Sequence, residues 1–306
     1  MSGILTGFAI IGVVMAVGYL AARLRLGGPD AQTALNRIGF FVASPALLFT
    51  VIARADVAEL FQAPLLVQAA AALGCAAIFV VANVLWLRRP MAEATVGAAA
   101  SGYVNANNIG LPVAVYVLDD ATAVVPVILL QLLVLAPVTL LVLDARTSGR
   151  VSLGFVLSQP VRNPIILGSL AGAVVSVTGW TVPDVVLAPL EILGGGAIPM
   201  ILLAFGMSLH GSRPLAPGDG RSAILVASAL KSVVMPALAF VLARYAFELD
   251  QATVVAAVTL AALPTAQNIY NYAARFRTGE VLARDTVLVT TVLSPVVLVV
   301  ATVLLH

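Results

Sequence analysis

Long apolar runs alternate along the chain with short polar connections, and most of these runs are long enough to cross a bilayer. About 20 apolar residues span the hydrocarbon core as an α-helix. The runs predict ten such spans, near residues 4–22, 36–53, 64–87, 93–118, 122–143, 162–180, 187–209, 223–246, 252–276 and 282–305. The pattern therefore predicts an all-α integral membrane protein with one membrane domain over residues 1–306.

Two of these runs are interrupted by residues that do not suit a continuous membrane helix. The first interruption is Asn105-Ala-Asn-Asn-Ile-Gly-Leu-Pro112, and the second is Leu263-Pro-Thr-Ala-Gln-Asn-Ile-Tyr-Asn271. The bilayer core contains no water to solvate bare backbone groups, so a broken helix is tolerated there only where it is buried in protein or lines a cavity. Corresponding interruptions in two halves of a chain are typical of secondary transporters, whose binding site lies at the repeat interface.

The order of the spans predicts an internal repeat. Because each half has five spans, the second half would enter the membrane upside down, which gives two inverted five-helix repeats with broken, crossing spans 4 and 9. The expected parts are repeat 1 at 1–144, a linker at 145–159 and repeat 2 at 160–306. Proline positions recur in the same order, with Pro45 and Pro199 separated by 154 residues and Pro137 and Pro295 by 158. Each proline alone is explained by helix kinking, but the ordered set favours a repeat.

Composition supports a membrane location and speaks against other classes. The chain is 61% hydrophobic and 10% charged, with a mean hydropathy of +1.08, whereas an average soluble domain has about 25% charged residues. The net charge of +2 and the scattered arginines speak against a nucleic-acid partner. Cys75 is the single cysteine, so we expect no disulfide framework and no thiolate metal cluster.

Arginine placement predicts the orientation of the chain. The connections after the odd-numbered spans hold 13 arginines, whereas the opposite connections hold only Arg54 and Arg244. Short cytoplasmic loops carry the Lys/Arg excess. We therefore expect a multi-pass membrane protein with both termini on the outer side of the membrane.

The two interruptions supply the candidate substrate-binding groups. A broken helix exposes the N–H groups that begin the next half-helix, and their positive dipole end attracts anions. Nearby amides offer donors and acceptors without charge, which suits a carboxylate; they are Asn105, Asn107, Asn108, Gln267, Asn268 and Asn271. The alternative is that such amides link helices. We favour binding for Asn105, leave both roles open for Asn107 and Asn271, and expect Gln68 and Gln131 to link helices.

Lys231 is the one lysine of the chain and lies about nine residues into its span, or roughly 14 Å from the cytoplasmic end at 1.5 Å per residue. An ionisable residue at this depth is by default a candidate for function. Its expected role is a counter-ion to an anionic substrate. The alternative is that its side chain extends back to the interface.

The acidic residues all fall in loops or near span ends, so no span carries a mid-membrane carboxylate and proton coupling has no obvious carrier. An anion is therefore the better substrate. His210 and His306 are the only histidines, and neither an HExxH helix nor a phosphate-binding GxxxxGK[ST] loop is present. We therefore expect no enzyme activity, no cofactor and no metal site.

The chain resembles the auxin efflux carrier family, whose bacterial members include malonate and other organic-acid permeases, and it is more distantly similar to the bile-acid, arsenite and riboflavin carriers. The residues that carry the resemblance are Asn105-x-x-x-Ile109-Gly110-Leu111-Pro112, Ala261-Ala262-Leu263-Pro264, Asn36-Arg37 with Pro45, and Lys231 followed by Pro236. No single motif is specific, but their order covers essentially the whole chain.

The resemblance implies a scaffold domain that forms the surface of a homodimer and a mobile transport domain that moves like an elevator. The scaffold helices would be about 4–53 and 162–209, and the transport helices about 64–143 and 223–305. Family similarity also implies particular roles at the crossing of spans 4 and 9: Pro112 and Pro264 would be the crossover prolines, and Asn105 would contact the substrate carboxylate. The long cytoplasmic loop of plant members is absent, which argues against auxin itself.

These observations predict a secondary transporter of small organic anions, either mono- or dicarboxylates, in which Lys231 and the half-helix ends surround the carboxylate. Sodium or proton coupling stays open. One alternative is a sodium-coupled symporter of the bile-acid type, with the ion held by oxygens of Asn108, Gln267 and Asn268. An alternative from another class is a substrate sensor or anion channel that uses the same fold without alternating access.

Overall fold

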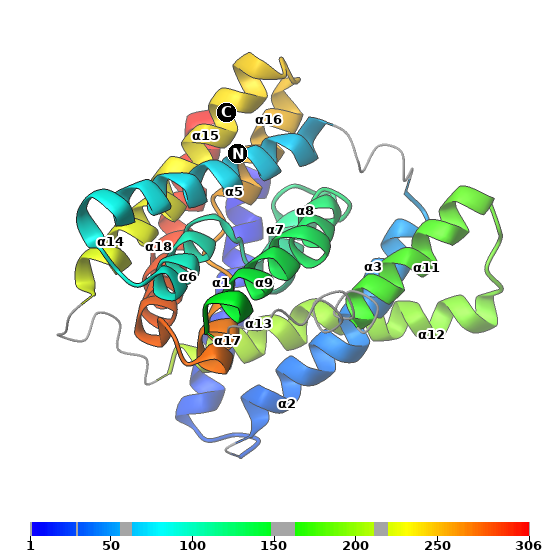
Figure 1. Ribbon diagram of the computed structural model, residues 1–306. Helices are drawn as coiled ribbons and strands as arrows, with labels where there is room; N and C mark the ends of the chain where they lie inside the picture. The colour runs from blue at the N-terminus through cyan, green and yellow to red at the C-terminus, as the bar shows by residue number, and fades with distance from the viewer. Residues whose placement is uncertain (1, 29, 56–62, 148–162, 211–219, 306) are drawn as a thin grey trace. The chain divides into compact units, whose positions relative to one another are not determined.

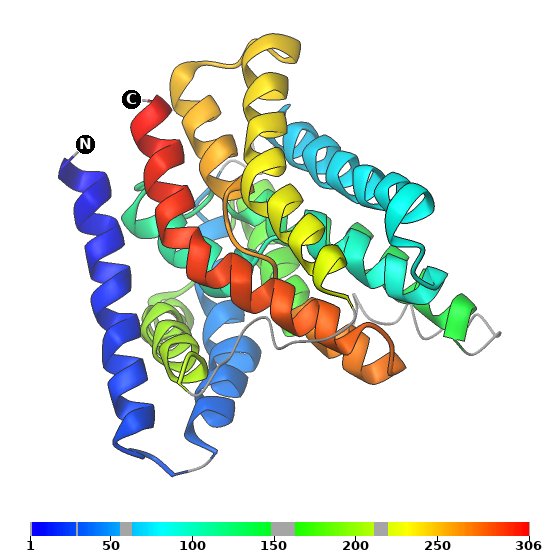
Figure 2. The same cartoon turned by 90° about the vertical axis from the view of Figure 1, so that its left-hand side faces the viewer.

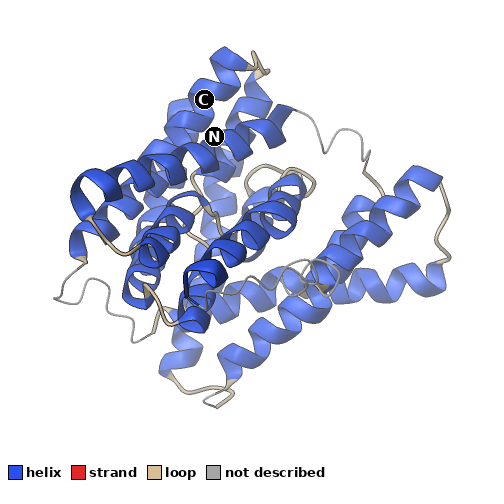
Figure 3. Ribbon diagram, in the orientation of Figure 1, coloured by secondary structure: helices blue, strands red, loops and turns tan. Residues whose placement is uncertain are grey.

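The computed structural model describes residues 2–28, 30–55, 63–147, 163–210 and 220–305. These residues form α-helices and short π-helices and no strand (Figure 3). The all-α prediction is confirmed for this part of the chain. The expected linker at 145–159 lies mostly outside the described residues, as do three of the arginines used for the orientation, which are Arg150, Arg162 and Arg213.

The chain divides into two compact units, and each unit gathers segments from both halves of the sequence (Figure 1). Unit 1 contains Met1–Gln62, Asn107–Ile128 and Gln159–Ser212. Unit 2 contains Ala63–Ala106, Leu129–Ser158 and Arg213–His306. The first interruption therefore straddles the two units, whereas the second lies wholly in unit 2.

Unit 1 is built from helices that approach each other closely through glycines. Its helices are α1 (Ser2–Arg23), α2 (Ala31–Ile38), η1 (Gly39–Ala43), α3 (Ser44–Ile52), α7 (Leu111–Tyr116), α11 (Pro164–Thr178), α12 (Asp184–Gly195) and α13 (Ala197–Ser208). A Cβ at Gly206 of α13 would lie 2.0 Å from the Met15 carbonyl oxygen of α1, and one at Gly168 of α11 would lie 2.6 Å from the Pro45 carbonyl oxygen of α3. Small residues of this kind let membrane helices pack backbone to backbone.

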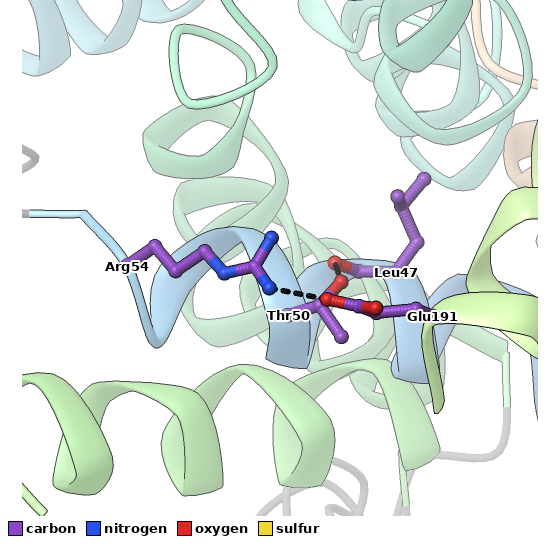
Figure 4. A network of polar contacts seen from close by, with 4 residues as sticks. All are labelled: Leu47, Thr50, Arg54 and Glu191. Atoms are coloured by element: carbon purple, nitrogen blue, oxygen red, sulfur yellow. Dashed lines mark hydrogen bonds and ion pairs between the residues drawn. The ribbon is translucent and has the colours of Figure 1, made fainter. Parts of the chain in front are cut away.

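A polar contact joins two of these helices at an exposed position. Arg54 follows α3 and forms an ion pair with Glu191 of α12 (Figure 4). One turn earlier, the Thr50 hydroxyl donates to the Leu47 carbonyl oxygen at 2.9 Å, within α3. Both charged side chains are substantially exposed, so the pair links the end of α3 to the surface of α12 and is not part of the core.

Unit 2 contains both helices that lead into the interruptions. Its helices are α5 (Ala63–Ala82), η2 (Asn83–Leu87), α6 (Met91–Gly102), η4 (Gln131–Leu135), α9 (Ala136–Thr147), α14 (Arg221–Ala229), η5 (Leu230–Val234), α15 (Met235–Val241), η6 (Leu242–Ala246), α16 (Gln251–Ala261), α17 (Asn268–Phe276) and α18 (Glu280–Leu305). Figure 2 shows α18 in red beside the yellow helix that begins with α14 and continues as η5, and both of these pack against α18. Two further elements, η3 (Ala106–Gly110) and α8 (Val125–Leu130), cross from one unit to the other.

Proline positions explain most of the π-helical segments. Of the six within the described residues, η1, η3, η4 and η5 are each followed by an α-helix whose second residue is proline; these prolines are Pro45, Pro112, Pro137 and Pro236. Proline lacks an N–H and its ring clashes with the carbonyl group four residues earlier, so a wider turn just before it relieves the clash. Pro295, which the sequence paired with Pro137, instead lies inside the continuous helix α18. The local structure therefore differs within this proline pair.

Six helical stretches are long and apolar enough to cross a bilayer among the residues described: Ala31–Ile52, Ala63–Leu87, Val125–Arg146, Asp184–Ser208, Arg221–Ala246 and Glu280–Leu305. Shorter apolar helices lie at Ala9–Arg23, Pro164–Thr178 and Gln251–Ala261. The runs at 93–118 and 252–276 are each divided into separate helices, as the two interruptions predicted. These features are those of an integral membrane protein, and the arrangement of ten spans as inverted repeats stays a prediction.

Candidate functional site

The first interruption begins where α6 ends at Gly102. A Cβ at this glycine would lie 2.4 Å from the Ala72 carbonyl oxygen of α5, so only glycine allows the two helices to approach this closely. The next residue, Tyr103, is extended, with φ −95° and ψ 110°. The chain resumes a helical path in η3, and Pro112 is the second residue of α7. Residues 103–105 therefore lie outside the helices, and some of their backbone N–H and C=O groups have no hydrogen-bond partner within a helix.

The second interruption begins where α16 ends at Ala261. Proline disfavours the α conformation in the residue before it, so Pro264 prevents Leu263 from continuing the helix. Helix α17 starts at Asn268, with Gln267 as its N-terminal flanking residue. Residues 263–266 are thus extended or turn-like, and all four are buried.

The two interruptions pair directly with each other. Val104 and Thr265 form an isolated antiparallel bridge. The Asn105 N–H donates to the Pro264 carbonyl oxygen at 2.8 Å, and the Ala266 N–H donates to the Tyr103 carbonyl oxygen at 3.0 Å. An unpaired backbone group is costly where no water is available. Each interruption therefore satisfies polar groups that the other leaves without a helical partner.

Three side chains satisfy further backbone groups at the crossing, two from neighbouring helices and one from Thr265 itself. Gln131 of η4 donates through Nε2 to the Val104 carbonyl oxygen at 2.8 Å. Thr290 of α18 accepts the Thr265 N–H on its Oγ1 at 3.1 Å. The Thr265 hydroxyl in turn donates to the Ala100 carbonyl oxygen of α6 at 2.7 Å. The crossing is therefore held by a network of buried hydrogen bonds within unit 2.

Lys231 contacts the end of α16 that leads into the crossing. Its Nζ donates to the Ala261 carbonyl oxygen at 2.6 Å, and its side chain is fully buried. The interpretation that this side chain extends back to the membrane interface is therefore wrong. Ala261 is the last residue of α16, and the C-terminal end of a helix carries partial negative charge that a cation stabilises. The lysine amino group thus lies at the end of the broken helix.

Comparison with known proteins identifies the class of the chain. A family model described as "Membrane transport protein" matches residues 4–150 and 144–302. The chain belongs to this family. It is the auxin efflux carrier family that the sequence resembled, so this resemblance is confirmed. A relative from Rhizobium meliloti (strain 1021), named "Putative malonate transporter", is 29% identical over 286 residues, which cover 91% of this chain and 88% of the relative. As a member of the family, the protein is a multi-pass membrane transporter rather than an enzyme.

The structure distributes the predicted site residues of this transporter between its two units. Unit 2 holds Asn105, Lys231, Pro264, Gln267 and Asn268, whereas Asn107, Asn108 and Pro112 belong to unit 1. Within unit 2, Asn105 and Pro264 are brought together by their backbone hydrogen bond.

The exposure of these residues also differs. Asn105 is buried, with 4% of its surface exposed, whereas Gln267 and Asn268 are partly exposed at the start of α17. In unit 1, Asn107 donates through Nδ2 to the Asn108 side-chain oxygen at 3.0 Å, and both residues are partly exposed. The partly exposed amides retain surface that a ligand can contact.

The two amides that we expected to link helices do so. Gln68 of α5 donates to the Ala257 carbonyl oxygen of α16 at 2.6 Å, and Gln131 makes the bond to Val104 described above. Both side chains are buried. Their role is therefore structural, as predicted.

Sequence reasoning missed several residues of the crossing. Tyr103, Thr265 and Thr290 are buried there. The Tyr103 hydroxyl interacts with the side chains of Tyr272 and Asn268, although it makes no hydrogen bond of ordinary geometry. Tyr103 and Thr265 flank or lie within the interruptions, so their position was a usable signal. Thr290 had no such signal, because it lies in the middle of a continuous apolar helix.

One acidic residue also differs from expectation. Asp285 lies near the start of α18, as its place in the sequence predicted, but its side chain is fully buried. Its position agrees with the prediction that acidic residues lie in loops or near span ends, but the burial of its side chain was not predicted. The reason is tertiary, because the early turns of α18 are covered by α6, α14 and α17.

Proposed function

We propose that this transporter carries small organic anions, mono- or dicarboxylates, by elevator-type alternating access. The observation that carries the proposal is the direct pairing of the two interruptions, which brings Asn105 and Pro264 together in one buried crossing. Discontinuous membrane helices that meet in this way are the usual location of substrate sites in secondary transporters. The similarity to a relative named "Putative malonate transporter" supports a carboxylate as the substrate.

In this proposal the substrate carboxylate is bound by neutral donors. The proposed binding residues are those with an amide side chain or a half-helix end at the interruptions: Asn105, Asn107, Asn108, Gln267, Asn268, Pro112 and Pro264. Amide side chains and the N–H groups at a helix start stabilise an anion without a full counter-charge. Lys231 is the proposed counter-ion to the carboxylate: one N–H of its Nζ donates to the Ala261 carbonyl oxygen, and an ammonium group has two further donors.

The movement in this proposal is a displacement of a transport domain against a scaffold domain. The division of the chain into two compact units supports it, since unit 1 includes most of the predicted scaffold helices and unit 2 most of the predicted transport helices. Residues 107–128 differ, because they group with unit 1 rather than with the transport helices. We further propose a homodimer in the bacterial inner membrane with periplasmic termini, as the family resemblance and the arginine distribution indicate.

The test is transport by the purified protein in liposomes, with labelled malonate, longer dicarboxylates and indole-type acids, each with and without a sodium gradient. We expect saturable uptake of a carboxylate without sodium, and its loss in Asn105→Ala. Asn36→Ala, which makes the same chemical change on α2, is the matched control and should transport normally. Strict sodium dependence would instead favour the bile-acid type of symporter, and binding without flux would favour a sensor.

A further inference from the structure

Asp285 is a buried carboxylate that the proposed binding site does not use. It is the sixth residue of α18, which begins at Glu280, and therefore lies about 8 Å along the helix axis at 1.5 Å per residue. None of its side chain is exposed. An ionisable residue in the interior of a membrane protein is costly to maintain and is a candidate for function.

The two oxygens of this carboxylate have different environments. Oδ1 accepts a hydrogen bond from the Arg284 Nε at 2.7 Å. Oδ2 is buried and has no hydrogen-bond partner. Carboxylates buried away from water normally have both oxygens hydrogen-bonded. One oxygen of Asp285 is therefore available to bind a proton.

Within the described residues, Asp285 has one ion pair, to Arg284. This pair does not fully offset the cost of burying the charge of Asp285. The Arg284 side chain is 45% exposed, so its charge is shared with solvent. The neighbouring Thr286 is fully buried, and its hydroxyl also lacks a hydrogen-bond partner. Two adjacent residues of α18 thus present unpaired polar oxygens to the interior of unit 2.

The other charged and titratable groups on the surrounding elements are engaged elsewhere or lie at helix ends. Helices α6, α14, α16 and α17 and segment η5 pack against α18. Apart from Asp285 and Arg284, the charged and titratable groups on α18 and these elements are as follows: Glu280 on α18 itself, Glu93 on α6 with an ion pair to Arg89, Arg221 at the start of α14, Lys231 on η5 bonded to Ala261, and Tyr270, Tyr272 and Arg275 on α17. Within Gln251–Ala261, α16 carries no ionisable residue. Of these groups, Tyr270 interacts electrostatically with Arg284, and none donates a hydrogen bond to Oδ2.

We propose that Asp285 binds and releases one proton in each transport cycle and thereby couples the movement of the anion to a proton gradient. The proton adds to Oδ2 of the carboxylate, forming an O–H bond and a neutral carboxylic acid, and the same bond breaks on release. Arg284 remains protonated throughout. The neutral acid is the form that is less costly to keep buried. This inference rests on the proposed function and assigns its coupling ion.

The experiment uses the purified full chain in liposomes that contain a trapped pH-sensitive dye. Labelled malonate is added outside, with or without an inward proton gradient. The wild-type protein should acidify the lumen when malonate enters. For one proton per cycle, a gradient of one pH unit supplies the free energy for about tenfold further accumulation.

The decisive variant is Asp285→Asn, which keeps the shape of the side chain and cannot be ionised. It should retain exchange of labelled for unlabelled malonate but lose both the lumen acidification and the stimulation by the proton gradient. Glu280→Gln removes an exposed carboxylate from the first residue of the same helix and should behave like the wild type. If Asp285→Asn does not fold, Asp285→Glu replaces it; this variant moves the carboxylate by one methylene and should retain coupling with a changed rate of proton-driven uptake.

Each result separates the inference from the proposed function. Malonate uptake by the wild type without proton movement would overturn the role of Asp285 and leave the carboxylate transporter intact. Unchanged proton coupling in Asp285→Asn, or an unchanged rate of proton-driven uptake in Asp285→Glu, would also overturn it. An absence of uptake of any tested carboxylate by the wild type would refute the proposed function itself.

Discussion

The backbone N–H of Asn105 donates a hydrogen bond to the carbonyl oxygen of Pro264 at 2.8 Å. The two residues are far apart in the sequence, and each lies in an interruption of an apolar run. The bond uses the backbone of Asn105 rather than its side chain. Asn105 therefore combines a structural role, carried by its main chain, with a side chain that we propose for substrate binding.

The first prediction separates these two roles of Asn105. Asn105→Ala keeps the N–H that bonds to Pro264, so the crossing should still form and the protein should remain folded. Substrate affinity should fall by about tenfold or more, since a hydrogen bond to a charged ligand is worth about 1.5–3 kcal/mol. Binding of labelled malonate and thermal unfolding in detergent measure the two effects. A large loss of stability with unchanged affinity would contradict this assignment.

The second prediction concerns Lys231 and the end of α16. Lys231→Met keeps most of the side-chain volume but leaves the Ala261 carbonyl oxygen without its 2.6 Å partner. An orphaned buried acceptor costs about 1–3 kcal/mol, so the melting temperature should fall even without substrate. If Lys231 served only as a counter-ion to the substrate, stability without ligand would not decrease. Thermal unfolding with and without malonate distinguishes the two roles.

The third prediction uses two adjacent threonines of α18. Thr290→Val removes the oxygen that accepts the Thr265 N–H and should destabilise the protein by about 1–3 kcal/mol, because that buried donor would be left unpaired. Thr291 is also buried, but its hydroxyl has no hydrogen-bond partner. Thr291→Val is therefore the matched control and should have a neutral or stabilising effect. Equal destabilisation by both variants in a denaturation series would rule out this role for Thr290.

The fourth prediction is a pH dependence at the start of α16. The Asp250 carboxylate accepts hydrogen bonds from the Thr253 hydroxyl and from the backbone N–H groups of Thr253 and Ala252. These bonds, that of the Thr253 hydroxyl first, lower the pKa of Asp250 below its usual value of 3.8. Because the folded-state pKa is lowered, the stabilisation is complete above the usual pKa and is lost as the pH falls through the folded value.

The test of this cap is thermal unfolding from about pH 7 down to about pH 3. Asp250→Ala should destabilise the protein at pH 7, because an N-cap replaced by alanine loses its side-chain acceptor. Asp250→Asn keeps an acceptor but does not titrate in this range, so it should reduce the loss of stability in acid. An acid profile that is identical in the wild type and in Asp250→Asn would show that another group controls it.

The fifth prediction concerns the packing of unit 1. A side chain at Gly206 would press on the Met15 carbonyl oxygen, since a Cβ there would lie 2.0 Å from it. Gly206→Ala should therefore push α1 and α13 apart and destabilise the protein by about 1–3 kcal/mol, as overpacking does. Gly195→Ala is the control, because a Cβ at Gly195 meets nothing within 4 Å. Similar melting temperatures for the two variants would contradict the close contact.

Much of the fold was predictable because the bilayer restricts the chain so strongly. The apolar runs predicted the helices, and the prolines and amides at Asn105–Pro112 and Leu263–Asn271 predicted where two runs are divided into separate helices. The linking role of Gln68 and Gln131 also followed from the sequence, since a lone amide on an apolar helix needs a partner in a neighbouring helix. These are local consequences of hydropathy, proline geometry and the need to pair polar groups.

The sequence by itself determined that this protein is an all-α membrane protein with two interrupted runs, and its motifs determined the family to which it belongs. Only the tertiary structure decided that Val104 and Thr265 pair, that Lys231 bonds to Ala261, and that Asp285 near the start of α18 is fully buried. The physical reason is that hydropathy and backbone propensity act over a few residues. Hydrogen-bond partners and burial depend instead on which distant segments the fold brings together.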